Sequence, residues 1–150
     1  MKTDINIAKN FNLNNITLDL SKELNYAGDI IVKDHVARLE RGQDANEKQM
    51  KPLAESTIKA KGFNQILVEK DKMRHLVRTK ASASKQSVTI KPGDKEKRKG
   101  GLTNIEIAAF HQEGGPNLPK REWFGISRKA EKKAMDMVEK RIDKMIKCLT

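Results

Sequence analysis

The stretch SRKAEKKAMDMVEKRIDKMIK, residues 127–147, carries the clearest secondary-structure pattern in the chain. Its apolar residues recur at spacings of three and four, which is the period of an amphipathic helix. They are Ala130, Ala134, Met137, Val138, Ile142, Met145 and Ile146. Ser127 is a suitable N-cap, and Glu131 and Lys144 have the charges that the two ends of a helix favour. The pattern predicts a long C-terminal helix that packs on a sheet or on a partner.

A second helical pattern covers residues 20–41. Leu20, Leu24, Ala27 and Ile31 share one stripe, and Gly42 is a suitable end. His35 falls on the same stripe, which predicts a partly buried core histidine rather than a ligand. After a polar connection, residues 52–57 predict a short helix or turn with Pro52 at its first helical position.

The β signal lies in the middle of the chain. Residues 87–91 alternate, with Val88 and Ile90 on one face, and residues 76–83 are compatible with a strand. Residues 105–110 fit either a strand or a short helix, whereas 92–101 and 111–119 are rich in Gly and Pro and predict loops.

These elements predict one α+β domain over residues 1–150. Its small antiparallel sheet would have three to four strands, with the N-terminal helix and the long amphipathic C-terminal helix packed on it. Residues 1–18 are expected to form a flexible N-terminal arm, and residues 84–101 an extended basic loop region.

Composition excludes several classes of protein. The chain has 150 residues, a formal net charge of +11 and a single cysteine, Cys148. No run approaches the roughly 18 apolar residues of a membrane-spanning helix, and the N-terminus lacks the apolar core of a secretory signal. One cysteine excludes an internal disulfide framework and suits a reducing cytoplasm.

The positive charge is unevenly distributed. Residues 1–56 hold eight basic and nine acidic side chains, residues 57–85 hold eight and two, and residues 120–150 hold ten and five. The excess therefore follows residue 56, which favours a surface that faces a polyanion or an acidic partner. Lysine enrichment for solubility explains the same numbers equally well.

No catalytic or metal-binding pattern is present. His35, His75 and His111 are far apart in sequence, without the spacing of a zinc site, and Cys148 has no base near it. Two glycines, Gly100 and Gly101, are too few for a phosphate-binding loop. We therefore expect no enzymatic activity, no cofactor and no metal.

Nucleic-acid binding is the alternative function. Basic residues cluster at positions 59–61, 70–78 and 95–99, but the whole chain has six aromatic residues, and single-strand binders interleave cations with stacking aromatics. A small basic protein that contacts phosphates without reading sequence fits this composition.

Three segments, taken in order, resemble a known family. The first is GQDAN (42–46) followed by KPLA (51–54) and TIKAK (57–61), and the second is ILV (66–68) leading to KMR (72–74). The third is AFHQEG (109–114) followed by LPKREWFGIS (118–127). In this order they resemble the tailed-phage virion morphogenesis and tail-completion proteins of the Mu-like kind.

The resemblance implies a structural virion protein without catalytic activity, which completes the phage tail or joins the tail to the head. It further implies a homo-oligomeric ring, with a hexamer as one candidate, in the tail or neck of a virion assembled in the host cytoplasm. The implied neighbours are tail tube, tail terminator or head–tail connector proteins. No membrane contact is expected, and genomic DNA would pass through the lumen.

Six residues are candidates for contacts at an interface or in the lumen. Lys95, Lys97, Arg98 and Lys99 could face DNA. Arg121 could pair with a carboxylate or with carbonyls, and Trp123, if exposed, would anchor an interface. The pair Trp123–Phe124 could equally hold the last helix to the fold, which is the reading that we favour for Phe124.

Overall fold

A computed structural model describes residues 3–5, 18–67, 75–93 and 101–148. Its elements are β1 (Thr3–Ile5), α1 (Ser21–Glu40), α2 (Glu55–Lys61), β2 (Leu76–Arg78), β3 (Val88–Pro92), α3 (Asn104–Glu113) and α4 (Arg128–Lys147). The predicted class, a mixture of helices with a small antiparallel sheet, is confirmed. None of the described helices is both long and apolar enough to cross a membrane.

The sheet is centred on β3, which pairs antiparallel with β2 on one edge and with β1 on the other. Val88 and Ile90 are both buried, as their alternation predicted, and lie in the core beneath α1. Residues 3–5 of the expected N-terminal arm thus form a strand, and β3 interrupts the loop expected over 84–101. The rest of the arm, up to residue 17, lies outside the described residues.

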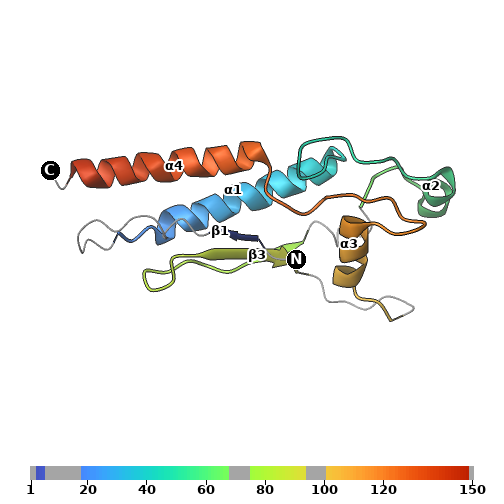
Figure 1. The fold of residues 1–150 in the computed structure, drawn as a ribbon, viewed down its shortest axis with the longest axis horizontal. Helices are drawn as coiled ribbons and strands as arrows, with labels where there is room; N and C mark the ends of the chain where they lie inside the picture. Colours follow the sequence, from blue (N-terminus) through green and yellow to red (C-terminus); the bar gives the residue numbers. More distant parts are fainter. Residues whose placement is uncertain (1–2, 6–17, 68–74, 94–100, 149–150) are drawn as a thin grey trace.

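Of the two long helices, only α1 packs directly on the sheet. Figure 1 shows α1 lying over the sheet and α4 lying along the other side of α1. The approach of α1 to β3 is close because Gly28 has no side chain: a Cβ there would stand 3.1 Å from Cγ1 of Val88. The prediction that α4 packs on the sheet is therefore wrong. The spacing of apolar residues in α4 reveals that one face of this helix is buried, but it does not reveal which element covers that face. In the structure, α1 covers it.

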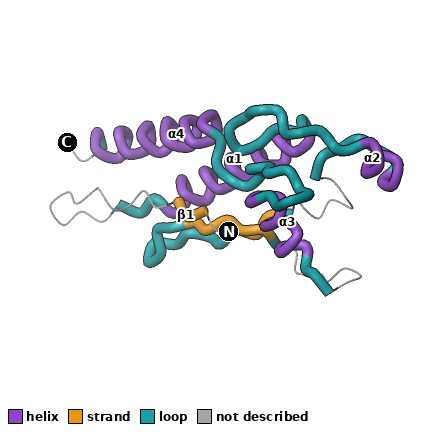
Figure 2. Tube along the Cα trace, turned by 45° about the vertical axis from the view of Figure 1, so that its right-hand side comes forward, coloured by secondary structure: helices purple, strands orange, loops and turns teal. Residues whose placement is uncertain are grey.

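Two clusters of buried side chains form the core. The first joins α1, α4 and the strands through residues such as Leu24, Val88 and Val138. The second lies around Trp123 at the other end of α1 and includes Leu39 and Ala108. Figure 2 shows the loops that connect this second end to α2 and α3.

One local prediction needs correction, and one alternative that the sequence left open is decided. The short helix α2 begins at Glu55 after Ala54 as N-cap, so Pro52 lies outside it and shapes only the extended entry. The stretch 105–110, left open between strand and helix, lies in α3. Thr103 and Glu106 form a reciprocal capping box there, which stabilises the first turn against the β propensity of the isoleucines.

Candidate functional site

The first and third of the segments that carry the family resemblance meet at Arg121. The side chain of Arg121 donates to the carbonyl oxygens of Lys51 (3.1 Å) and Pro52 (3.2 Å), and its backbone N–H donates to the carbonyl oxygen of His111 (2.7 Å). Burial lowers the pKa of the Arg121 guanidinium from its ordinary value, although an arginine remains charged at neutral pH. Arg121 therefore joins two motif segments inside the chain, through carbonyls as one of the predicted alternatives had it.

Trp123 is fully buried. Its indole N–H donates to the carbonyl oxygen of Ala108 in α3 (2.9 Å), and its ring lies 5.3 Å from that of His35 and 5.6 Å from that of Phe124. Of the two roles left open for Trp123, an interface anchor would need an exposed side chain, whereas α1 and α3 cover this one. Neither Trp123 nor Arg121 is available to a partner in the chain as folded.

Gln112 completes this junction, and the sequence reasoning missed it. Its amide donates to the carbonyl oxygen of Phe124 (3.2 Å) and accepts from the Phe124 N–H (3.0 Å). These two bonds satisfy both backbone polar groups of a residue that is almost buried. The position of Gln112 in the AFHQEG segment is the feature of the sequence that could have indicated its role.

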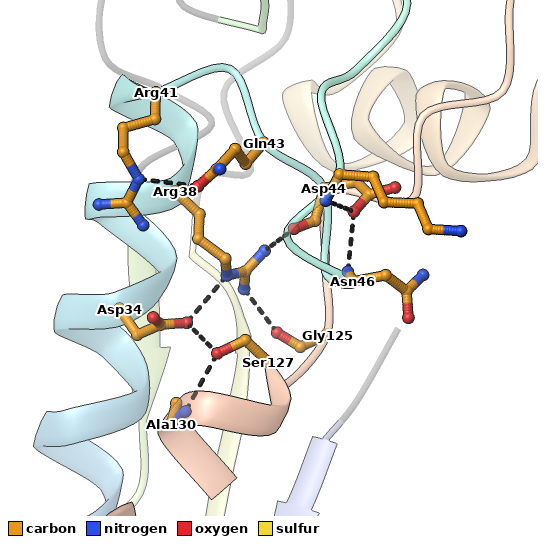
Figure 3. A network of polar contacts seen from close by, with 10 residues as sticks. Asp34, Arg38, Arg41, Gln43, Asp44, Asn46, Gly125, Ser127 and Ala130 are labelled. Atoms are coloured by element: carbon orange, nitrogen blue, oxygen red, sulfur yellow. Dashed lines mark hydrogen bonds and ion pairs between the residues drawn. The ribbon is translucent and has the colours of Figure 1, made fainter.

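A second missed feature is the polar network of Arg38, drawn in Figure 3. The fully buried guanidinium donates to Oδ2 of Asp34 (2.8 Å) and to the carbonyl oxygens of Asp44 (2.9 Å) and Gly125 (2.8 Å). The Ser127 hydroxyl donates to the same Asp34 oxygen and accepts from the N–H of Ala130. Arg38 thereby ties α1 to the loop after it and to the segment that leads into α4, and Asp34 ties α1 to Ser127, the N-cap of α4.

The close approach at Gly125 yields a testable prediction. A Cβ on Gly125 would stand 2.8 Å from Cβ of Ala45, on the loop after α1. We expect Gly125→Ala to lower the free energy of unfolding by about 2 kcal/mol, because neither backbone can give way without disturbing the Arg38 network. Urea unfolding measures the change.

Ala45→Gly provides the matched rescue. The double variant should recover most of the lost stability, as residues in direct contact are coupled. If the double variant is as unstable as the sum of the two single changes, the close contact is not the cause.

An open groove runs along the contact between α1 and α4, and we call it the α1–α4 groove. On the α1 side it is lined by Lys22, Tyr26, Ile30 and Lys33. On the α4 side it is lined by Lys129, Lys133, Met137, Lys140 and Lys144. This surface holds much of the basic excess that the sequence showed after residue 120.

Exposed apolar side chains mark the opposite end of the molecule. Phe110 in α3 is 48% exposed, and Leu102 before α3 and Phe63 after α2 are similarly open. Helix α2 itself buries no residue. Helices α2 and α3 therefore leave much of their surface without a covering element in the described chain.

The other residues singled out in the sequence lie outside the described residues, in the core or at the surface. Lys95, Lys97, Arg98 and Lys99 lie outside the described residues. His35 is a buried core histidine, as predicted. Among the described residues, no three His, Cys, Asp or Glu side chains are grouped so as to hold a metal ion, and Cys148 is exposed.

Comparison with protein families assigns the chain to a family. The model of the phage virion morphogenesis family matches residues 7–143, which covers all of the motif segments described above. The match is to the family as a whole and does not identify a Mu-like branch. No curated protein and no solved structure matches the chain.

Proposed function

Since this chain belongs to the phage virion morphogenesis family, we propose that it completes the phage tail or joins the tail to the head, as one subunit of a closed ring. The family gives a role in building the virion. The finer assignment to a tail-completion or head–tail joining ring is our proposal. In this proposal the protein works by binding geometry and carries out no reaction.

The observation that carries the ring proposal is the presence of two different surfaces that no other element of the described residues covers. A ring needs a heterologous contact, in which one face of each subunit binds a different face of the next. The apolar end with Phe63, Leu102 and Phe110 supplies one such face. The side of the sheet away from α1, where Val77 is 40% exposed, supplies a second.

The proposed partners are other copies of this chain and the neighbouring tail or connector proteins of the particle. Contact between genomic DNA and Lys95, Lys97, Arg98 and Lys99 belongs to the same proposal. Neutralising these four side chains should reduce genome retention or ejection without unfolding the protein. An unchanged infectious titre would contradict the contact with DNA.

Removing the apolar end should abolish the ring. We expect the purified chain to have a mass several times its 17.0 kDa and the variant Leu102→Ser/Phe110→Ser to be a monomer. Both side chains are exposed, so the variant should keep its helical circular dichroism. Light scattering after size-exclusion chromatography measures the mass.

The control for this experiment replaces exposed apolar residues elsewhere. Met135 and Ile146 on α4 are 40% and 37% exposed, and Met135→Ser/Ile146→Ser should leave the oligomer intact. A wild-type protein that stays monomeric both at high concentration and on purified tails would contradict the ring.

A further inference from the structure

The α1–α4 groove is long enough to hold a helix. Two adjoining hollows share Tyr26, Ile30, Lys129 and Lys133, so they form one continuous depression. On α1 it extends from Lys22 to Arg41, which at 1.5 Å per residue is about 28 Å. A helix of about 18 residues has the same length.

The groove is open because α4 contacts α1 through a narrow stripe. The buried residues of α4 are Ala130, Ala134, Val138 and Ile142, one per turn. Beside this stripe, Ile30 and Met137 are only half-buried, and Tyr26 is 56% exposed. These three side chains give the groove an apolar floor.

The rims of the groove are positively charged. Three of its acidic groups are held by cations: Glu23 by Arg141 (3.0 Å), Asp29 by Arg78 (2.7 Å) and Asp34 by Arg38 (2.8 Å). Lysines line both sides, at positions 22, 33, 129, 132, 133, 140 and 144, and they form no ion pair with any described residue. The charge that the groove presents to a ligand is therefore strongly positive.

We propose that the α1–α4 groove binds an amphipathic helix of a different virion protein, with one apolar stripe and acidic residues on both flanks. The apolar stripe would cover Tyr26, Ile30 and Met137, and the acidic flanks would meet the lysine rims. Helix-in-groove recognition uses this combination. The inference deepens the proposed function, on which it rests, by giving the ring a surface for a second protein.

Two other occupants fit the groove less well. A DNA backbone would match the lysines but would leave the apolar floor uncovered. A second copy of this chain would bring its own lysine-rich α4 against the rims, with like charges facing one another. The α3 helix of a second copy would not fill the groove either, because its ten residues span only about half of the groove's length.

The test measures binding of a labelled peptide to the full-length protein by fluorescence anisotropy. The probe is a synthetic helical peptide of about 18 residues with leucine along one stripe and glutamate on both flanks. A peptide with glutamine in place of glutamate and a DNA duplex of similar length are the comparison ligands. The oligomeric mass of each protein sample is measured in parallel.

Three variants separate charge from apolar contact. Lys133→Glu/Lys140→Glu should weaken binding of the acidic peptide about tenfold, and Tyr26→Ser about fivefold. The control Lys59→Glu/Lys85→Glu makes the same change in net charge at exposed sites outside the groove and should have little effect. Tyr26→Ser should leave any DNA binding unchanged, because phosphates do not use the floor.

The inference is overturned if the wild-type protein fails to bind the acidic peptide, or if it binds the glutamine peptide equally well. It is also overturned if the groove and control variants lose binding to the same extent, or if only DNA binding responds to the groove variants. If the oligomeric mass still shows a ring in these cases, the inference about the groove has failed and the proposed function has not.

Discussion

Replacement of Trp123 by alanine is expected to lower the free energy of unfolding by about 4 kcal/mol. The side chain is fully buried, packs against His35 and Phe124, and donates its N–H to the carbonyl oxygen of Ala108. The substitution would leave a large cavity between α1 and α3 and remove the hydrogen bond that joins the indole to α3. Such a loss is a large fraction of the stability of a typical domain. Urea unfolding followed by far-ultraviolet circular dichroism gives the value.

Trp123→Phe is the matched control. It retains most of the ring packing but removes the hydrogen bond, so we expect a loss of about 1–2 kcal/mol. Tyr26→Ala, at an exposed aromatic residue of α1, should cost less than either. A stability of Trp123→Ala within about 1 kcal/mol of wild type would show that position 123 is not a core position.

Replacement of Arg38 by methionine should lower the free energy of unfolding by about 3 kcal/mol. Methionine has a similar volume, so the change removes charge and donors with little loss of packing. It would leave the Asp34 carboxylate without its cation and remove one hydrogen bond from each of the carbonyl oxygens of Asp44 and Gly125. The single tryptophan, Trp123, reports unfolding by its fluorescence.

Arg41→Met is the comparison for this substitution. Arg41 lies one turn further along, and its Nε donates to the side chain of Gln43 at an exposed site. We expect a change below about 0.5 kcal/mol there. Equal effects at the two positions would contradict the account of Arg38 as the link between α1, its following loop and the segment that leads into α4.

The elements with strong periodicity could be predicted from the sequence. The helical stripes of α1 and α4 and the alternation of β3 each need burial of one face, and the residue spacing reveals that need directly. What covers each face depends on contacts between distant parts of the chain. For this reason the sequence left open whether α4 packs on a sheet or on a partner, and its true cover is α1.

The junction residues were harder to predict because their role is set by distant backbone. Asp34 and Arg38 are four residues apart on a helix and resemble a solvated surface pair. Only the carbonyls of Asp44 and Gly125, brought in by two loops, make the site a buried network. The exposure of Trp123 was undetermined for the same reason, since α1 and α3 cover it only in the folded chain.

The α1–α4 groove was visible in the sequence only as basic charge after residue 120. A lysine on the outer face of an amphipathic helix is usually a solubilising residue. The structure adds that the lysines of both helices face one open channel with Tyr26, Ile30 and Met137 between them. That arrangement distinguishes a binding surface from a solvated face.

The most direct test of the central claim is cryo-electron microscopy of the purified virions or tail-like particles that contain this protein. We predict density for the chain as a closed ring at the junction of head and tail or at the end of the tail that joins it. The apolar end of each subunit should contact the next subunit. Absence of the chain from every particle, or its presence as isolated copies without a closed ring, would contradict the account.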